Sequence, residues 1–277
     1  MHIFFTGGSG TIGSAVIPAL LEQGHQVSAL ARSDESAAKV EAAGATAVPG
    51  DLTDAGVLRD AAAAADATIH VGSPGDQTSA QVDREGAAAM QEGAGPDRLY
   101  VHTGGIWVYG DTDGEVDEDA PQDPPPLVVW RAEVETEVLG RGNASLVMPA
   151  VVYGPDPGLL ELTYGPGEDD VGRYPGEGSA RSTAVHAEDI AALYAIVVSQ
   201  PAGLRVLGVA ECVPVKTLAE AQSPKGEARP ESAEEMEARL GPLAAAMSLD
   251  QQLSSARARS LGWEPQHTDV VATLSAG

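Results

Sequence analysis

The chain has 277 residues, which is enough for one large domain or for a domain with a small lobe. Its 41 acidic and 16 basic residues give a formal net charge of −25 at pH 7, and a surface of this sign repels nucleic acid and anionic membranes. The single cysteine, Cys212, excludes an internal disulfide and a cysteine-cluster metal site, and no apolar stretch of about 18 residues predicts a transmembrane helix.

The first predicted element is an apolar strand, His2–Thr6, which leads directly into a glycine-rich turn ending at Gly13. In such a turn Gly7 permits the sharp bend, Gly10 lets the backbone approach a pyrophosphate, and Gly13 lets the next helix pack closely on the strand. The helix N-terminus offers free N–H groups to phosphates. The turn therefore predicts dinucleotide binding. Because the chain begins with a core strand, we expect no signal peptide and a cytoplasmic location.

Strand and helix patterns alternate after this turn, which predicts a doubly wound parallel α/β sheet of Rossmann type. The predicted strands are His2–Thr6, Gln26–Ala31, Ala45–Val48, Ala67–Val71, Leu99–Thr103, Ser145–Pro149 and Leu204–Val209. The predicted helices are Thr11–Gln23, Glu35–Ala43, Ala55–Ala65, Ser79–Glu92, Leu127–Leu139 and Ala187–Ser199.

Two segments depart from this alternation. Gly154–Gly178 is rich in glycine and proline and predicts a loop insertion, and the chain from Val215 onward is mainly helical and polar, with a segment over Ser223–Glu231 that we expect to be mobile. The predicted division is a dinucleotide-binding core and a small substrate lobe over the carboxyl edge of the sheet, where ligands bind in such folds. The core comprises residues 1–155, completed by 182–212, and the lobe comprises 156–181 and 213–277.

Further motifs follow the glycine turn in a fixed order along the chain. They are Gly24–Ser33, Gly50–Asp54, Asp66–Gly72, Val101–Gly110, Pro149–Pro155, Val185–Ala191 and Ala258–Pro265. Together with the turn, they resemble the extended short-chain dehydrogenase/reductase superfamily, in its NAD-dependent epimerase/dehydratase group, over nearly the whole chain. The resemblance implies a nicotinamide cofactor and a small-molecule substrate, and it allows a homodimer.

The resemblance also implies which residues meet the cofactor. Asp51 and Leu52 would hold the adenine ring. Members that prefer NAD carry an acid after the second strand, whereas this chain has Arg32 and Ser33 there, which could bind a 2′-phosphate. NADP(H) is therefore expected over NAD(H). The implied cofactor residues are Thr6, Gly7, Gly10, Thr11, Ile12, Gly13, Arg32, Ser33, Asp51, Leu52, Val71 and Gly72.

The catalytic pattern of the superfamily is broken in this chain. Its members move a proton through a Tyr-x-x-x-Lys pair on the helix after the fifth strand, with a Ser or Thr on that strand. Thr103 fills the Ser/Thr position, but none of the six tyrosines has a lysine four residues later. Aligned on Glu137, the helix carries Val129 at the tyrosine position and Glu133 at the lysine position.

Several residues could replace the missing pair. Tyr109 could supply a phenol or only pack, and Glu133 could act as an acid or base, attract a cationic substrate together with Asp83, or lie in solvent. His70 and His102 are expected to be buried and neutral. The candidate catalytic residues are Thr103, Tyr109 and Glu133. The candidate substrate-pocket residues are Trp107, Trp130, Val129, Val152, Tyr153 and Tyr164.

Three functions remain open from the sequence. The first is an atypical NADP(H)-dependent oxidoreductase that acts on a small carbonyl, enone or imine without the usual acid pair. The second is a non-redox isomerase or dehydratase that uses Glu133 or Asp83 as a base. The third is an NADP-binding sensor without catalysis. The acidic composition leaves two explanations open as well, an ordinary solvated acidic surface or adaptation to high salt.

Overall fold

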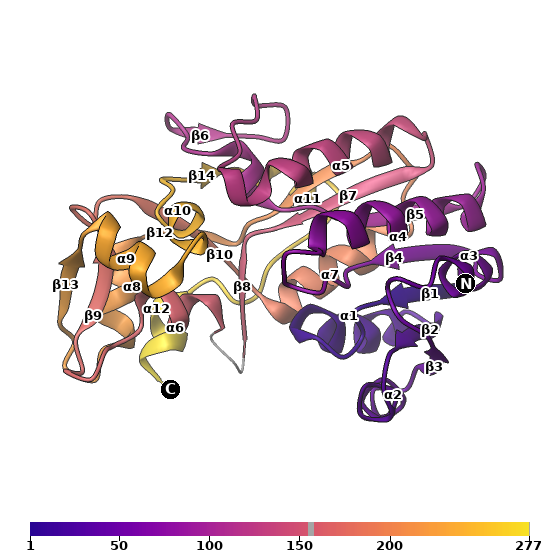
Figure 1. The fold of residues 1–277 in the computed structure, drawn as a ribbon, viewed down its shortest axis with the longest axis horizontal. Coiled ribbons are helices and arrows are strands. Elements are labelled where there is room, and N and C mark those ends of the chain that lie inside the picture. The colour runs from indigo at the N-terminus through magenta and orange to yellow at the C-terminus, as the bar shows by residue number, and fades with distance from the viewer. Residues whose placement is uncertain (155–157, 277) are drawn as a thin grey trace.

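The computed structural model describes residues 1–154 and 158–276 of the chain. A seven-stranded parallel sheet of order β11-β7-β5-β4-β1-β2-β3 lies at its centre (Figure 1). The strands are β1 His2–Thr6, β2 Gln26–Ala31, β3 Thr46–Pro49, β4 Ala67–His70, β5 Leu99–Thr103, β7 Ala144–Pro149 and β11 Arg205–Gly208. The predicted doubly wound α/β sheet is confirmed, with strand ends displaced by one residue at most.

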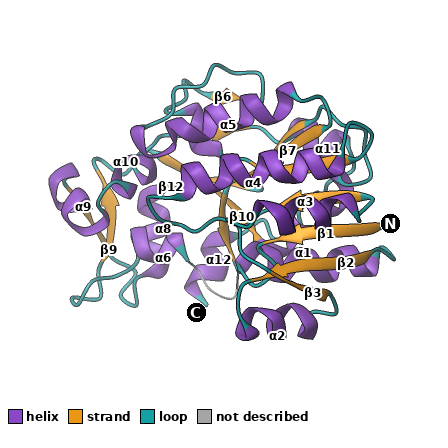
Figure 2. Ribbon diagram, turned by 45° about the vertical axis from the view of Figure 1, so that its right-hand side comes forward, coloured by secondary structure: helices purple, strands orange, loops and turns teal. Residues whose placement is uncertain are grey.

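Helices cover both faces of this sheet. Helices α3, α4 and α5 pack side by side on one face, while α1 packs against α7 on the other (Figures 1 and 2). The helices are α1 Thr11–Glu22, α2 Asp34–Ala42, α3 Ala55–Ala63, α4 Ser79–Ala94, α5 Val129–Gly140 and α7 Ala187–Val197. Two short 3₁₀ helices, η1 Ile106–Tyr109 and η2 Pro126–Val128, lie between β5 and α5. All six predicted helices are present, with ends that shift by at most two residues.

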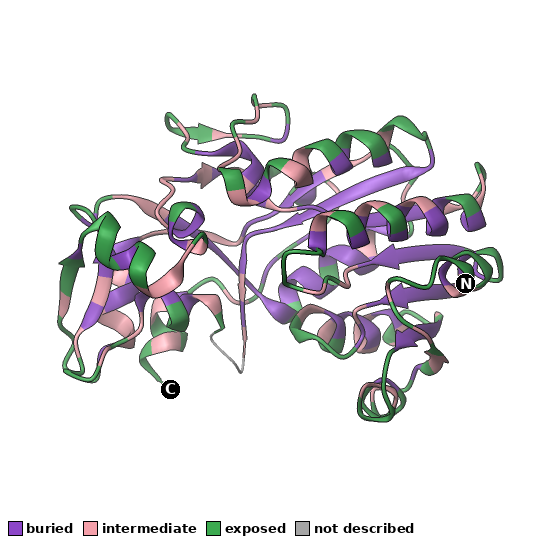
Figure 3. Ribbon diagram, in the orientation of Figure 1, coloured by how far each residue is buried: buried purple, intermediate pink, exposed green. Residues whose placement is uncertain are grey.

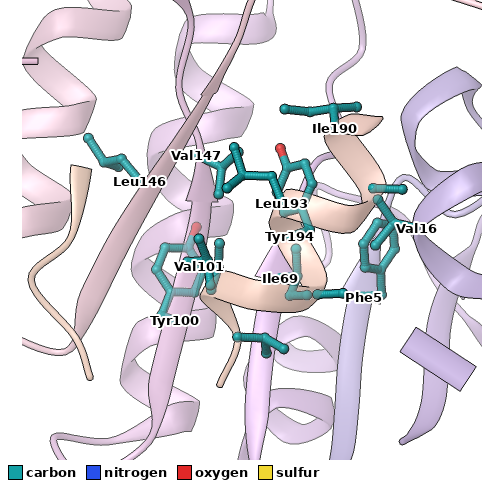
Figure 4. Packing of buried hydrophobic residues seen from close by; sticks show 14 of the residues in the cluster. Phe5, Val16, Ile69, Tyr100, Val101, Leu146, Val147, Ile190, Leu193 and Tyr194 are labelled. Atoms are coloured by element: carbon teal, nitrogen blue, oxygen red, sulfur yellow. The ribbon is translucent and has the colours of Figure 1, made fainter. Parts of the chain in front are cut away.

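The central strands are apolar runs because both of their faces are covered. Ile3, Phe4 and Phe5 of β1 are fully buried, and Figure 3 shows the middle of the sheet buried along its length. Figure 4 shows Phe5 and Ile69 packed towards side chains of α7. Each fully buried side chain of this size contributes roughly 1.5–3 kcal/mol to stability. This core fixes the positions at which the parallel strands end.

Smaller elements form a second body beside the large sheet (Figure 1). They include a three-stranded sheet of order β12-β10-β8 and the strand pair β13 with β9, whereas the pair of β14 with β6 packs with the first apolar cluster around the large sheet. The strands are β6 Glu115–Val116, β8 Val151–Tyr153, β9 Gly172–Pro175, β10 Arg181–His186, β12 Glu211–Pro214, β13 Ala228–Glu231 and β14 Gln252–Leu253. The helices of this body are α6 Leu159–Tyr164, α8 Val215–Gln222, α9 Ala233–Leu240, α10 Leu243–Met247 and α12 Val270–Ser275, whereas α11 Ala256–Ser260 packs on β11 of the large sheet.

Two segments differ from the prediction. The expected loop over Gly154–Gly178 contains α6 and β9, although its residues 155–157 lie outside the described part of the chain. The segment expected to be mobile ends in β13, which pairs in parallel with β9. Neither strand of this pair has alternating apolar and polar residues. They are strands because they pair with each other, and the sequence of each one alone does not predict this.

Buried apolar residues form two clusters. The second cluster contains Tyr153, Tyr164 and Leu218, and it fills the smaller body. Trp263, near the end of the chain, packs instead with the first cluster around the large sheet, and its Nε1 donates to the carbonyl of Asp189. The division into a core and a substrate lobe stays a prediction. Within the described residues, no helix has the length and apolar character needed to cross a membrane.

Candidate functional site

A cavity of about 710 Å³ follows the carboxyl ends of β1, β2, β3 and β4. Of the twelve residues that the resemblance implied for the cofactor, all but Thr6 and Ser33 line it. Those that line it are Gly7, Gly10, Thr11, Ile12, Gly13, Arg32, Asp51, Leu52, Val71 and Gly72. The structure thus brings the residues of four separate strand ends together along one groove, as the glycine turn requires.

The glycine turn is held by close backbone contacts. Gly7 has a φ of +83°, and a Cβ there would lie 2.7 Å from the backbone nitrogen of Gly72. A Cβ on Gly13 would overlap the carbonyl oxygen of Gly7. A Cβ on Gly10 would meet no protein atom closer than 3.5 Å. The missing side chain at Gly10 therefore leaves space for a ligand and not for another part of the protein. The turn therefore presents bare backbone to the cavity.

Two cations lie where the cavity passes α2, Arg32 just before the helix and Lys39 in its last turn. Arg32 and Lys39 both line it, with Ser36 on the same helix. Ser33 does not, because its hydroxyl caps α2 by accepting the N–H of Ser36 at 3.2 Å. The sequence assigned Ser33 to the cofactor and missed Ser36 and Lys39, although their spacing of three residues places them on one helix face. Lys39 Nζ lies 2.8 Å from Glu35.

Thr6 lies behind the cavity wall and acts on it through hydrogen bonds. Its hydroxyl oxygen accepts the backbone N–H groups of Val71 at 3.3 Å and Gly72 at 3.2 Å, and it lies 2.6 Å from Nδ1 of His70. With both lone pairs taken, the hydroxyl donates its proton to that nitrogen. The neutral His70 ring therefore carries its own proton on Nε2, which lies 3.1 Å from Asp83 Oδ1.

The second oxygen of Asp83 meets another histidine. His102 Nε2 lies 3.4 Å from Asp83 Oδ2, and His102 Nδ1 lies 2.9 Å from the hydroxyl of Tyr100. With Tyr100 as the donor to Nδ1, the proton of His102 lies on Nε2 and faces Asp83 Oδ2. The side chains of His70, Asp83 and His102 are close enough together to hold a metal ion. With the protons of both rings on Nε2, however, two N–H groups face the carboxylate of Asp83. The cluster suits one carboxylate held between two imidazole N–H groups.

The pKa shifts agree with this arrangement. Burial alone would raise the pKa of Asp83, but the hydrogen bonds from His102 and His70 outweigh it and hold the pKa well below its usual range. Burial lowers the pKa of His102, despite the opposing effect of Asp83, and it raises the pKa of Tyr100. The expectation of buried histidines holds for both positions. The sequence did not show that Asp83 joins them.

A second cavity, of about 500 Å³, adjoins the first and shares Thr11, Ile12, Val71, Gly72 and Ser73 with it. Most of its wall comes from three further segments, which are the end of β5, the turn between β7 and β8, and the start of α6. A nucleotide along the first cavity would therefore bring its far end into the second.

The predicted pocket residues divide between this cavity and other places. Trp107 and Val152 line it. Val129 is 42% exposed, and Trp130 Nε1 donates to the carbonyl of Leu127 at 3.0 Å. Tyr153 and Tyr164 are fully buried in the second apolar cluster. These four residues therefore do not line the cavity, which corrects the expectation for them. For Val129 and Trp130 the cause is the register of α5, because Val128 and Arg131 face the cavity instead.

The three catalytic candidates also lie in different environments. Thr103 lines the second cavity, but its hydroxyl donates to the carbonyl of His70 at 2.7 Å and lies 2.6 Å from the hydroxyl of Tyr194. Tyr109 donates to the carbonyl of Glu118 at 3.1 Å, and burial raises its pKa to about 12. Its hydroxyl is therefore bound away from the cavity, which agrees with the packing role left open for Tyr109 and not with a phenol in the site.

Glu133 lies outside both cavities. Its carboxylate is 62% exposed and forms an ion pair with Arg84 of α4 at 3.0 Å. Of the readings left open for Glu133, the exposed position in solvent agrees with the structure, and the place in the pocket does not. The physical reason is again the rotation of α5, which turns this carboxylate towards α4 and solvent.

A carboxylate two residues further along α5 is buried, and the sequence reasoning missed it. Glu135 is fully buried and accepts the backbone N–H of Gly105 at 3.2 Å, directly behind the wall of the second cavity. Burial raises its pKa to about 7, with Arg131 and the Gly105 N–H opposing the rise. Its only sequence signal is a spacing of four residues from Arg131, which shares its helix face.

Replacing Glu135 with glutamine is expected to change how stability depends on pH. A folded pKa of about 7, above the ordinary value of 4.5, means that the wild type loses stability as pH rises through this range. The loss from this one group amounts to about 3 kcal/mol above pH 8. Glu135→Gln should therefore match the wild type near pH 5 and exceed it at pH 8 in urea unfolding. A difference between the two proteins that stays constant from pH 5 to pH 8 contradicts this assignment.

Arg131 is the one cationic side chain among the described residues that line the second cavity. Its Nη1 donates to the carbonyl of Thr103 at 3.2 Å, and its guanidinium lies 4.6 Å from the ring centroid of Trp130. The wall around it is largely apolar. The cavity wall therefore carries one guanidinium, together with the buried carboxylate of Asp83.

Comparisons with known proteins agree with this geometry. Residues 7–201 match the model of a family described as NAD(P)H-binding. A protein of Schizosaccharomyces pombe, named only as uncharacterized, is 30% identical over 294 residues, which cover 99% of this chain and 98% of that protein.

Solved structures show the same fold. One is DesIV, a dTDP-glucose 4,6-dehydratase from Streptomyces venezuelae with NAD and TYD bound, with a TM-score of 0.77 and 21% identity over 100% of this chain and 96% of that one. Another is the human epimerase family protein SDR39U1 with NADPH, with a TM-score of 0.74 and 18% identity over 100% of this chain and 98% of that one. The likeness to the epimerase/dehydratase group that the motifs indicated is confirmed in the fold.

Proposed function

The chain belongs to the NAD(P)H-binding family, and from this premise we propose that it is an NADP(H)-dependent oxidoreductase acting on a small organic carbonyl, enone or imine. The observation that carries the proposal is the pair of adjoining cavities. The first has a volume of about 710 Å³ and the bare glycine turn that a dinucleotide needs, and the second adjoins it where the nicotinamide end would arrive. Hydride transfer belongs to the cofactor, so the chain has to bind, orient and exclude water.

The preference for NADP(H) rests on positive charge beside α2. Arg32 and Lys39 line the cavity there with the hydroxyl of Ser36, and the β2 end carries no acid for the ribose hydroxyls. A 2′-phosphate carries about two negative charges and accepts charge-assisted hydrogen bonds from both cations. The exposed pair of Lys39 with Glu35 is worth little, so a phosphate can replace it.

Replacing Arg32 and Lys39 together with alanine is expected to weaken NADPH binding by about a hundredfold or more and to leave NADH binding nearly unchanged. Each hydrogen bond to a charged group contributes roughly 1.5–3 kcal/mol, and only NADPH offers the phosphate. Fluorescence titration with both nucleotides measures the effect. Arg59→Ala, which removes a surface ion pair with Glu92, serves as the control. Equal losses of affinity for NADPH and NADH would contradict the assignment of Arg32 and Lys39 to the 2′-phosphate.

The proposed activity is tested by NADPH oxidation, followed at 340 nm, against ketones, enones and imines. Turnover of at least one class is expected. Bound NADPH without turnover of any class would favour the sensor without catalysis. The non-redox alternative receives less support, because Glu133 lies outside the cavity and both oxygens of Asp83 face imidazoles. Product formed without a change in absorbance at 340 nm would instead support the non-redox alternative.

A further inference from the structure

The second cavity offers a hydride acceptor a cation and no ordinary acid. Its described lining contains no tyrosine, lysine or glutamate, and the hydroxyl of Thr103 already donates to a carbonyl. His70 is engaged at both ring nitrogens, by Thr6 and by Asp83. Asp83 also lines the cavity, with Oδ1 3.1 Å from His70 Nε2 and Oδ2 3.4 Å from His102 Nε2, and a carboxylate offers no N–H donor. Arg131 is therefore the charged group with N–H donors to spare.

Arg131 is fixed in place before any ligand arrives. Nη1 holds the carbonyl of Thr103, and the guanidinium stacks on Trp130. Gly105 packs against its stem, since a Cβ there would lie 3.2 Å from Arg131 Cδ. A guanidinium has five N–H groups, of which the described contacts use one on Nη1. Donors that are positioned in advance, in a largely apolar cavity, stabilise a developing oxyanion most effectively.

We propose that Arg131 binds the oxygen of an α,β-unsaturated carbonyl substrate and that the enzyme reduces its conjugated double bond. This inference rests on the proposed function and narrows its three substrate classes to one. Hydride from NADPH forms a C–H bond at the β-carbon, the π electrons of the C=C bond move onto the oxygen as an enolate, and NADPH becomes NADP⁺. The α-carbon then takes a proton from water, which gives the saturated carbonyl compound.

The charge of Arg131 favours α,β-unsaturated carbonyl compounds over simple ketones and imines. Hydride addition to a simple ketone leaves a localised alkoxide, which needs a proton donor at the site, and guanidinium is a very weak acid with a pKa above about 12. An enolate spreads its charge over the oxygen and the α-carbon, so an ion pair with Arg131 can hold it without proton transfer. A protonated imine is a cation, which Arg131 repels, while the Asp83 carboxylate in the same cavity is buried against His70 and His102.

The test compares 2-cyclohexen-1-one with cyclohexanone, which lacks the double bond, and N-methyl cyclohexylimine as the imine. The wild type is expected to reduce the enone preferentially. NADPH deuterated at C4 should place deuterium on the β-carbon, and D₂O should place solvent deuterium on the α-carbon. Arg131→Met should lower kcat/KM for the enone about 10²- to 10³-fold. Arg131→Lys should recover part of this loss, because it keeps the charge but not the fork of donors.

The NADPH dissociation constant, measured on every variant, separates a folding failure from a catalytic one. Both variants should keep the NADPH dissociation constant within about threefold of the wild type, because Arg131 lines the second cavity and not the first. Reduction of the ketone or imine but not the enone, deuterium on the carbonyl carbon, or an unchanged enone rate in Arg131→Met would overturn the inference and leave the proposed function standing. NADPH binding without turnover of any probe would overturn both.

Discussion

Replacing Asp83 with alanine is expected to lower the free energy of unfolding by roughly 3–5 kcal/mol, the range for removing one partner of a buried charged group. The change leaves the Nε2–H groups of His70 and His102 facing an apolar methyl group, and both rings are buried. It also loosens the contact of His70 with Thr6, whose hydroxyl oxygen holds the N–H of Gly72. We therefore expect weaker NADPH binding together with the lower stability.

Chemical denaturation of Asp83→Ala and of a control, Asp97→Ala, measures this effect. Asp97 is exposed, so its replacement should change stability by less than about 0.5 kcal/mol. Because the folded pKa of Asp83 is lowered, its contribution is present above its ordinary pKa, and the loss should be full from pH 5 to pH 8. A loss below about 1 kcal/mol would show that the carboxylate is not held between two donors.

Gly13→Ala is the second large effect, and it concerns the cofactor cavity. The new Cβ would overlap the carbonyl oxygen of Gly7, so α1 must move away from the turn. Overpacking of this kind costs roughly 1–3 kcal/mol of stability. A shift of the turn also removes the helix N-terminus from the pyrophosphate, and we expect NADPH affinity to fall about a hundredfold or more.

Two other glycines serve as controls for this prediction. Gly140→Ala adds a methyl group where no atom lies within 4 Å, and it should leave binding unchanged. Gly10→Ala has ordinary room within the protein, so it should keep its stability and lose affinity alone. Nucleotide titration and thermal unfolding report the two properties separately. Unchanged NADPH affinity in Gly13→Ala would mean that the pyrophosphate does not bind at this turn.

The sequence predicts the fold and the cofactor cavity well for a physical reason. Apolar runs such as Ile3–Phe5, alternating with helical patterns, leave a parallel sheet as the simplest solution, and the ends of its strands must meet at one edge. Glycine positions report backbone geometry directly, so the roles of Gly7 and Gly13 follow from their spacing after the first strand. Arg32 follows β2 immediately, and its place is fixed by the strand.

The second cavity could not be predicted as well, because its residues depend on helix register and tertiary contacts. An alignment along α5 selects Glu133, but a rotation of about 100° per residue decides which side chain faces inward. The structure buries Glu135, exposes Glu133 and turns Arg131 to the cavity. The pairing of Asp83 with His70 and His102 joins a helix to two strands, and no local pattern encodes it.

A crystal structure with NADPH bound tests the central claim most directly, since it reports both ends of the cofactor at once. We expect the 2′-phosphate within hydrogen-bond distance of Arg32 and Lys39, the pyrophosphate on the turn at Gly10–Gly13, and C4 of the nicotinamide opening into the cavity lined by Arg131. A 2′-phosphate that points into solvent, or a nicotinamide that lies outside the second cavity, would contradict it.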